Sequence, residues 1–236
     1  RSQLAAAGRA HVYMWVPVDK RMPPSRVVHH LRFRRLPPDS ARMAGADSAQ
    51  TLDEIYRGTS DVDLKRAVLR GLLEARATDR LAGVARTESS AELRGEAVQY
   101  LGALKATGEL EELYRSESNV DVKRRILQSL GFASDKLIPL VRAEKDPQLR
   151  LAAIRQLGFS NTPEATAALT GCYNSESSDD VRKAVIDAFG MQQQNAATLV
   201  SMARAEKNAE LKTYIVRRLS NMRAPEAREY MLELLK

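Results

Sequence analysis

Apolar positions in the stretch 118–131, SNVDVKRRILQSLG, recur at the spacing of an α-helix. The residues that would share one helical face are Val122, Ile126, Leu127 and Leu130. Asn119 precedes this face, at a position where its side chain can accept hydrogen bonds from the free N–H groups of the first turn. Gly131 follows, and a glycine with a left-handed backbone commonly ends a helix. The stretch therefore predicts one amphipathic helix with both ends marked.

The same pattern occurs five more times along the chain. In register, the blocks begin at residues 59, 89, 118, 145, 177 and 207, and their first apolar positions are Leu64, Leu93, Val122, Leu149, Val181 and Leu211. These positions are about 30 residues apart, and a period of that length is typical of a protein built from stacked repeats.

A second amphipathic segment precedes each block. A leucine stands twelve residues before every first apolar position, with apolar residues three and four places after it, namely Leu52, Leu81, Leu110, Leu137, Leu169 and Leu199. This spacing forms the packing face of a short helix. Each repeat is therefore predicted as a helix A, a tight turn, a helix B and a short loop. Residues 224–235 predict a further helix A, with Pro225 in the first turn, where proline is tolerated.

The helix B blocks resemble the motif of the HEAT-repeat family, in particular the short PBS-lyase-type HEAT-like repeat of bacterial proteins. That motif, an acidic turn residue, Val-Arg, and a closing Ala-Leu-Gly, is most complete in residues 180–190, DVRKAVIDAFG. The resemblance covers residues 49–236 and departs from the motif at Leu73, Gln148 and Ser220. It implies an all-α fold, a right-handed α-solenoid of about six two-helix repeats plus a terminal helix. It also implies that the A helices lie on the convex side and the B helices on the concave side.

The positive charge of the chain is unevenly distributed. The net charge is +7, from 37 basic and 30 acidic residues, and most of the excess lies in residues 1–48. That segment has no visible period and holds two Pro-Pro pairs, the only tryptophan and all three histidines. We therefore expect a basic N-terminal segment over residues 1–48, irregular or a degenerate repeat, and a repeat array over 49–236. The array is nearly neutral, which makes a nucleic-acid partner unlikely for it.

Cysteine content and hydropathy limit the remaining classes. Cys172 is the only cysteine, so it can form neither an internal disulfide nor a cysteine-based metal site. Its apolar helix position predicts a buried, unreactive thiol. Such usage fits a reducing, cytoplasmic compartment and is also compatible with a periplasmic one. No apolar run reaches the length of about 18 residues typical of a membrane span, so we expect a soluble protein.

Two charged columns recur in the first turn of helix B. The acidic column consists of Asp63, Glu92, Asp121, Asp180 and Glu210. Stacked carboxylates can bind metals, but each follows a typical N-cap residue, and the helix dipole favours negative charge there. The basic column consists of Lys65, Arg94, Lys123, Arg150, Arg182 and Lys212. We expect it to pair with carboxylates or turn carbonyls of neighbouring repeats, as a ladder of exposed pairs worth about 0–1 kcal/mol each.

The remaining polar positions of helix B are the candidate partner-binding residues. They project away from the predicted core and are mostly basic. They are Arg66, Arg70, Gln99, Arg124, Gln128, Arg155, Lys183 and Arg217. A plain solvated face, a groove for an acidic peptide and a weak site for nucleic-acid backbone all fit this pattern. Three tyrosines at equivalent helix A positions, Tyr56, Tyr114 and Tyr173, are expected to pack between repeats.

Catalytic chemistry finds no support in the sequence. The array contains no histidine, the commonest general base, and no recognised nucleotide, metalloprotease or hydrolase motif. We therefore expect a non-catalytic scaffold without cofactor or metal, which binds a protein or an acidic peptide segment. The alternatives are a HEAT-like subunit of a lyase or other enzyme complex, and a weak binder of nucleic acid.

Overall fold

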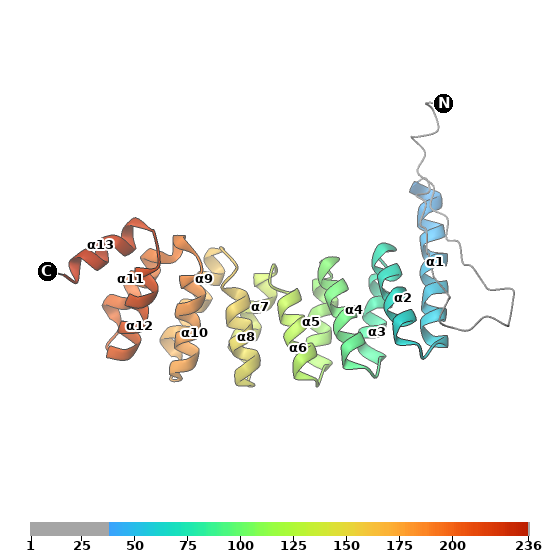
Figure 1. Cartoon of the computed structure of the whole chain (residues 1–236), viewed down its shortest axis with the longest axis horizontal. Helices are drawn as coiled ribbons and strands as arrows, with labels where there is room; N and C mark the ends of the chain where they lie inside the picture. Colours follow the sequence, from blue (N-terminus) through green and yellow to red (C-terminus); the bar gives the residue numbers. More distant parts are fainter. Residues whose placement is uncertain (1–37, 236) are drawn as a thin grey trace, which may run out of the picture. The chain divides into compact units, whose positions relative to one another are not determined.

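The computed structural model describes residues 38–235, with side chains from residue 48 onward. Most of the predicted N-terminal segment, including Trp15 and the histidines His11, His29 and His30, lies outside this range. All regular elements between residues 38 and 235 are helices, which confirms the prediction of an all-α solenoid (Figure 1). The chain forms two compact units, Arg1–Tyr100 and Leu101–Lys236, and the division falls within one helix, α4 (Ala91–Ala103).

Unit 1 contains the first repeats. Its helices are α1 (Pro38–Gly58), α2 (Val62–Glu74), α3 (Thr78–Thr87) and the greater part of α4. Helix α2 packs against both α1 and α3. Helix α1 begins before residue 49, so part of the predicted N-terminal segment belongs to the first helix A.

Unit 2 repeats the same helix pair four times and adds a terminal helix. Its A helices are α5 (Thr107–Ser116), α7 (Ser134–Ala143), α9 (Pro163–Ser175) and α11 (Ala196–Ala205). Its B helices are α6 (Val120–Ser129), α8 (Pro147–Leu157), α10 (Asp179–Gly190) and α12 (Ala209–Ser220). A short 3-10 helix, η2 (Gln193–Asn195), precedes α11, and α13 (Pro225–Glu233) packs against α11 and α12. Each B helix packs on the next one, so α6, α8, α10 and α12 form one layer (Figure 1).

Local sequence explains where most B helices begin. The side chains of Asp61, Asn119, Asp146 and Asn208 each accept hydrogen bonds from the backbone N–H groups two and three residues later. These bonds satisfy donors that the first turn leaves without a helical partner. Ser178 occupies the equivalent position before α10 but makes no side-chain cap bond. Before α4, Ser90 accepts one such bond, from the backbone N–H of Leu93 at 3.4 Å.

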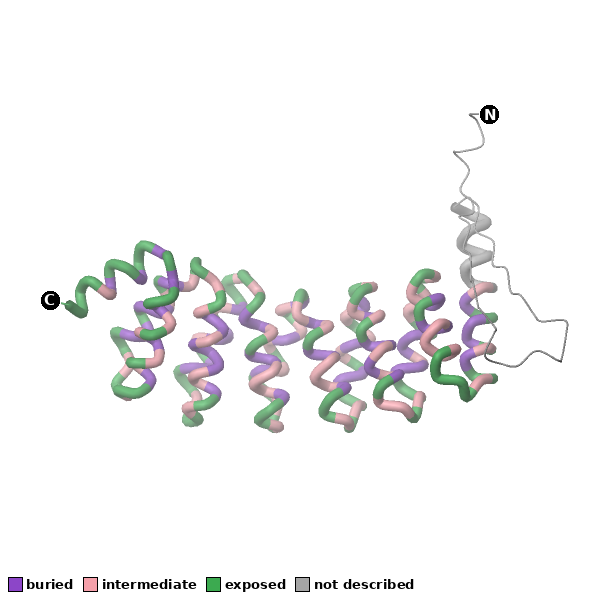
Figure 2. Tube along the Cα trace, in the orientation of Figure 1, coloured by how far each residue is buried: buried purple, intermediate pink, exposed green. Residues whose placement is uncertain are grey.

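The apolar positions of the repeat pattern form the core. The six leucines of the A helices are buried, and so are all first apolar positions of the B helices except Leu64, which is half-buried. Figure 2 shows buried positions recurring along the helices, with exposed positions gathered at the turns. The side on which helix B lies in the superhelix stays a prediction.

The glycine after helix B has a different role from the predicted one. No glycine between residues 38 and 235 has a positive φ, so the prediction of a left-handed Gly131 is wrong. At Gly158, a Cβ atom would lie 2.6 Å from the Cβ of Ala188. Glycine is therefore required there because α8 and α10 approach each other closely. The positive φ angles belong to Arg76 and Lys105, in the loops that precede α3 and α5.

Candidate functional site

A polar groove lies between α6 and α8 in unit 2. Its volume is about 340 Å³, and its lining residues are Arg124, Gln128, Gln148, Leu151, Ala152, Arg155 and Gln156. The lining contains two guanidinium groups and three carboxamides, without a carboxylate, histidine or cysteine. The structure therefore brings together Arg124, Gln128 and Arg155, three of the eight candidate partner-binding residues.

The repeat register explains why these side chains meet. Arg124 and Gln128 are four residues apart on α6, and Leu151 and Arg155 are four residues apart on α8. Residues at this spacing share one face of a helix, so each pair forms a row. Because α6 packs directly on α8, the two rows border the same groove.

The two arginines of the groove differ in how far their charges are satisfied. Arg124 is held by Asp121 at 2.6 Å, and its second terminal nitrogen lies 3.5 Å from the side-chain oxygen of Gln148 on α8. Arg155 is exposed, and its side chain makes no ion pair or hydrogen bond with residues 48–235. The groove thus combines one oriented guanidinium with one that has no protein partner among the described residues.

The other candidate partner-binding residues lie elsewhere. Arg66 in unit 1 is not free for a partner, because its guanidinium lies 2.5 Å from Glu92, 3.5 Å from Asp63 and 3.6 Å from Glu96. The candidates that lie outside both this cluster and the groove are Arg70, Gln99, Lys183 and Arg217. The structure therefore selects part of the predicted surface rather than the whole of it.

The carboxylates that pair with the basic column do not belong to the acidic column. Lys65 pairs with Glu88 at 2.7 Å, Arg150 pairs with Glu176 at 2.6 Å, and Arg182 pairs with Glu206. These three carboxylate side chains are only 5–10% exposed, so the pairs are largely buried instead of exposed as expected. Each pair joins helix B to the loop of the following repeat.

The remaining members of the basic column make other contacts. Arg94 donates to the carbonyl oxygens of Glu88 and Ser89, and the Lys123 ammonium lies 4.8 Å from the centre of the Tyr114 ring. Lys212 is half-buried and has no side-chain hydrogen bond or ion pair within residues 48–235.

The acidic column is exposed to solvent. Its members Asp63, Glu92, Asp121, Asp180 and Glu210 lie in the first turns of their helices. Three of them reach neighbouring arginines of the B helices, since Asp63 and Glu92 contact Arg66 and Asp121 contacts Arg124. The acidic column therefore contacts other arginines of the B helices. These three ion pairs do not involve the basic column.

A recurrent glutamate outside the two predicted columns also joins the repeats. Glutamate stands five residues before the first apolar position in five of the six repeats, at Glu88, Glu117, Glu144, Glu176 and Glu206. In each case one carboxylate oxygen accepts a hydrogen bond from the backbone N–H group two residues later. The first repeat has Thr59, whose hydroxyl accepts from the backbone N–H of Asp61. The constant position of this acid is the signal that could have revealed it.

The tyrosines bind this glutamate. The hydroxyl groups of Tyr56, Tyr114 and Tyr173 donate to Glu88, Glu144 and Glu206 of the following loops. All three rings are buried, so they pack between repeats and offer no stacking platform. Burial, together with the hydrogen bond to an anion, raises the pKa of each tyrosine above its ordinary value.

The glutamates remain charged in this setting. Burial acts to raise the pKa of Glu88, but hydrogen bonds from Lys65, the Ser90 backbone and Tyr56 outweigh burial and lower this pKa to about 2. Burial opposes the same kind of hydrogen bonds at Glu144 and Glu206, and the net pKa is again lowered. Each of these carboxylates is therefore ionised and links two neighbouring repeats. We call such a contact a glutamate junction.

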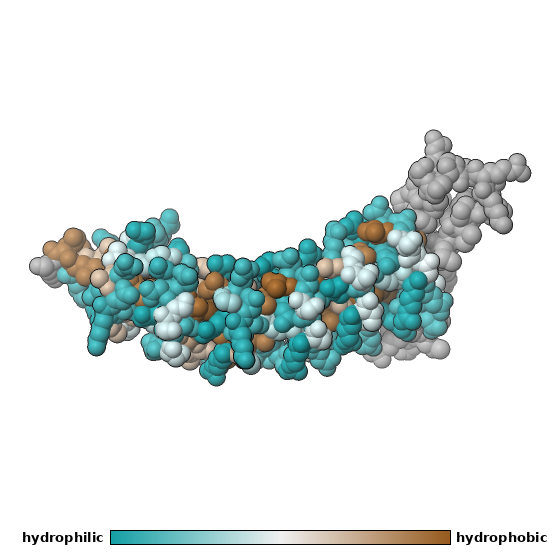
Figure 3. All heavy atoms as spheres, turned by 90° about the horizontal axis from the view of Figure 1, so that it is seen from below, coloured by the Kyte–Doolittle hydropathy of each residue, from teal (hydrophilic) through white to brown (hydrophobic). Residues whose placement is uncertain are grey.

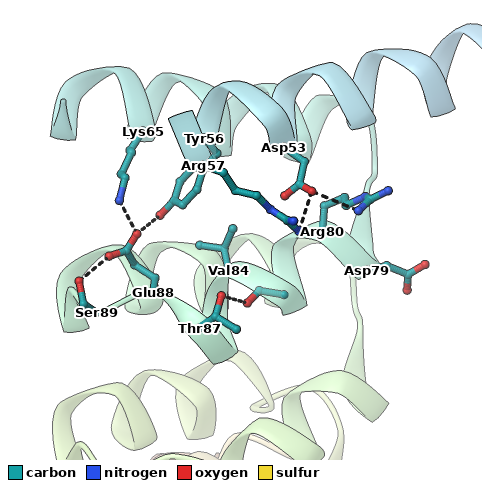
Figure 4. A pocket seen from close by; sticks show the side chains of 11 residues that line it. Asp53, Tyr56, Arg57, Lys65, Asp79, Arg80, Val84, Thr87, Glu88 and Ser89 are labelled. Atoms are coloured by element: carbon teal, nitrogen blue, oxygen red, sulfur yellow. Dashed lines mark hydrogen bonds and ion pairs between the residues drawn. The ribbon is translucent and has the colours of Figure 1, made fainter. Parts of the chain in front are cut away.

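Unit 1 contains a second pocket, of about 420 Å³, between α1 and α3 (Figure 4). Asp53, only 8% exposed, lies between Arg57 at 2.9 Å and Arg80 at 3.1 Å. The pair of Lys65 and Glu88 lies at the other end of this pocket. The buried carboxylates of the pocket are thus already bound by cations of the chain.

Cys172 lies away from both pockets. Its thiol is buried, and burial raises its pKa, which disfavours the thiolate. The Arg150 guanidinium lies 3.8 Å from the Sγ atom. In the described part of the chain, no helix is long and apolar enough to span a membrane.

Comparison with known proteins agrees with the repeat structure. The family model described as HEAT repeats matches residues 107–190, which run from the first residue of α5 to the last of α10. The matched segment is less than half of the chain and consists of three helix pairs, α5 to α10. The groove between α6 and α8 lies within the matched segment. No curated protein matches the sequence.

Two solved structures are similar to the chain at low identity. The complex of CpcE and CpcF of phycocyanin lyase from Nostoc sp. PCC7120 is 18% identical over 80% of this chain and 88% of that chain, with a TM-score of 0.39. The DHF79 filament is 14% identical over 84% of this chain and 99% of that chain, with a TM-score of 0.19. Because both TM-scores are low, neither structure indicates a function for this chain.

Proposed function

We propose that the chain is a non-catalytic protein-interaction scaffold that binds an acidic segment of a partner protein in the groove between α6 and α8. The observation that carries this proposal is the composition of the groove lining. Two arginines and three glutamines line the groove, Arg124 is paired with Asp121 outside the lining, and Arg155 has no partner within residues 48–235. A carboxylate bound there would satisfy an existing positive charge.

The geometry favours acidic side chains in an extended peptide. Hydrogen bonds between arginine and carboxylate are charge-assisted and about twice as strong as neutral ones. Arg124 is held in place by Asp121, which reduces the conformational entropy that it would lose on binding. The half-buried Leu151 adds an apolar contact to the groove. Affinity would then come from several modest contacts on a stacked, rigid array.

A scaffold role is favoured over catalysis by the same lining. General acid–base and nucleophilic catalysis need a titratable or nucleophilic side chain in the site, and the lining of the groove supplies neither. Nucleic-acid backbone could also contact two arginines. The near neutrality of the array favours a peptide, since nucleic-acid affinity depends on many simultaneous phosphate contacts.

A binding assay on the full chain tests the proposal. The probe is a short fluorescein-labelled peptide of glutamates and serines, measured by anisotropy at low ionic strength. The double variant Arg124→Glu/Arg155→Glu is expected to weaken binding at least about tenfold, because it reverses both charges. Arg217→Glu, on α12 and outside the groove, is the matched control and should change binding less than about threefold.

Two outcomes would overturn the proposal. In the first, the double variant retains its helical circular dichroism spectrum and still binds the peptide like the parent chain. In the second, a labelled DNA duplex binds the parent chain more tightly than the peptide does, and the same double variant abolishes that binding. The second result would assign the groove to nucleic-acid backbone.

A further inference from the structure

Unit 2 exposes a row of large apolar side chains next to the groove. Phe132, Phe159 and Met191 are 53%, 60% and 47% exposed. Each directly follows the glycine at the end of its helix B block, so the three residues occupy the same position in successive repeats. Exposed apolar residues scattered singly are ordinary on a protein surface, whereas a row at one repeat position forms a patch.

The two phenylalanines lie in the turns that directly follow α6 and α8, the helices that form the groove. Phe132 follows Gln128 by four residues, and Phe159 follows Arg155 by four residues. The side-chain oxygen of Gln156, a lining residue, lies 2.9 Å from the position of a Cβ atom at Gly131, the residue before Phe132. The groove lining therefore extends to the backbone next to the first phenylalanine. Because α6 packs on α8, and packed helices are about 8–10 Å apart, the two phenylalanines follow neighbouring helix ends.

We propose that the partner segment is both acidic and apolar, with carboxylates at Arg124 and Arg155 and a large aliphatic or aromatic side chain against Phe132 and Phe159. This inference rests on the proposed function and adds the chemistry of the partner. Charge complementarity selects this occupant, because the same groove presents a guanidinium with no partner among the described residues. The two exposed rings offer an apolar surface that a purely acidic segment would not cover.

The two kinds of contact respond differently to salt. Screening weakens the contacts between carboxylates and arginines, whereas burial of apolar surface is insensitive to it or strengthened. A peptide with both kinds of side chain should therefore retain more of its affinity at high salt than a purely acidic one. Burial of one leucine side chain between the rings corresponds to about a tenfold gain in affinity.

Two labelled peptides and two pairs of substitutions test the inference on the full chain. One peptide combines glutamates with leucines, and the other combines the same glutamates with serines. We expect the parent chain to bind the leucine peptide about tenfold more tightly. Phe132→Ser/Phe159→Ser should remove this preference and leave binding of the serine peptide unchanged. Leu232→Ser/Leu234→Ser, which removes exposed apolar residues of the C-terminal end, is the control and should retain the preference.

The outcomes separate this inference from the proposed function. In one outcome, both peptides bind the parent chain equally and the variant Arg124→Glu/Arg155→Glu binds neither. This result would overturn the apolar contact and leave the proposed binding of acidic segments in the groove intact. Binding of both peptides that is unaffected by the arginine variant would overturn the groove itself. If the parent chain is a dimer by sedimentation and the phenylalanine variant is a monomer, the row is a contact between copies, and this inference is wrong.

Discussion

The pocket of unit 1 and the groove of unit 2 have similar volumes and differ in how far their charges are paired. In the pocket between α1 and α3, Asp53 and Glu88 are each bound by cations of the chain. In the groove between α6 and α8, Arg155 has no such partner within the described residues. The pocket is the larger of the two, so cavity volume would select the site whose buried charges are already neutralised.

The surrounding surface supports the same distinction. The face drawn in Figure 3 is mainly hydrophilic, with an apolar patch at the C-terminal end, where Leu232, Leu234 and Leu235 are exposed. Charged groups are therefore common on this molecule. A binding site is indicated by charge that lacks a partner, not by charge alone. Residues of the pocket should consequently affect folding, and residues of the groove should affect binding.

The largest expected effect is on the stability of unit 1. Glu88→Ala removes the acceptor for Lys65, Tyr56 and the Ser90 backbone, and leaves those donors unpaired beside a buried site. We expect a loss of about 3 kcal/mol of unfolding free energy, measured by urea denaturation. Arg155→Ala, from the groove, should cost less than about 0.5 kcal/mol.

The control for this comparison is Glu74→Ala, an exposed acid at the end of α2 in the same unit. It should change stability by less than about 0.5 kcal/mol. Hydrogen exchange should locate the effect of Glu88→Ala in α1 to α3. Equal losses from Glu88→Ala and Arg155→Ala would remove the distinction between pocket and groove.

A second prediction concerns the frame of the groove. In Gly158→Ala, the new methyl group would overlap Ala188 of α10, including its backbone, so α8 must move. We expect a loss of about 2 kcal/mol and weaker binding of the acidic peptide. Gly190→Ala is the matched control in the next repeat, where the nearest atom is 3.4 Å away in the flexible Arg218 side chain. If both variants are equally stable, close helix approach is not the reason for glycine at this position.

A third prediction uses pH to test the pocket. The folded-state pKa of Glu88 is about 2, below its ordinary value of 4.5, so its contribution to stability is complete above 4.5 and is lost as pH falls through about 2. Glu88→Gln should therefore show a shallower decline of unfolding free energy over this range, by about 1–2 kcal/mol, in acid titrations followed by circular dichroism. If the unfolding free energies of the two proteins decline in parallel with pH, Glu88 is not held ionised at this glutamate junction.

The smallest expected effect comes from filling the pocket. Gly83 lines it from α3, and a Cβ atom there would meet nothing within 4 Å. Because alanine is the better helix former, Gly83→Ala should raise the unfolding free energy by about 0.5–1 kcal/mol. Binding of the acidic peptide should stay unchanged. Weaker peptide binding in Gly83→Ala would assign a binding role to the pocket of unit 1.

Most of the fold was predictable because its signals are local and repeated. A cap such as Asp146 followed by Pro147, and the apolar spacing after it, specify a helix start without knowledge of distant residues. The prediction for Gly131 is wrong because a glycine after a helix predicts a left-handed end, whereas at the equivalent Gly158 contact with the backbone of the neighbouring helix requires the glycine. That contact depends on how closely successive repeats approach each other.

The site was less predictable because it depends on which charges pair across repeats. Arg66 and Arg124 occupy the same repeat position, so their positions in the sequence do not distinguish them. Arg66 meets Glu92 and Glu96 of the next helix B, whereas Arg124 meets Gln148 at the place of Glu92. The substitution of glutamine for an acid at residue 148 thus removes a carboxylate from the groove. Sequence analysis noted this departure but could not assign its effect.

The glutamate junctions give the array a direction. Tyr114 donates to Glu144, Arg150 pairs with Glu176, and Tyr173 donates to Glu206. In every case the donor precedes the carboxylate in the sequence. During synthesis, which proceeds from the N-terminus, each donor is therefore made before the glutamate that it binds. Each new repeat can therefore dock on a repeat whose donors have already been made.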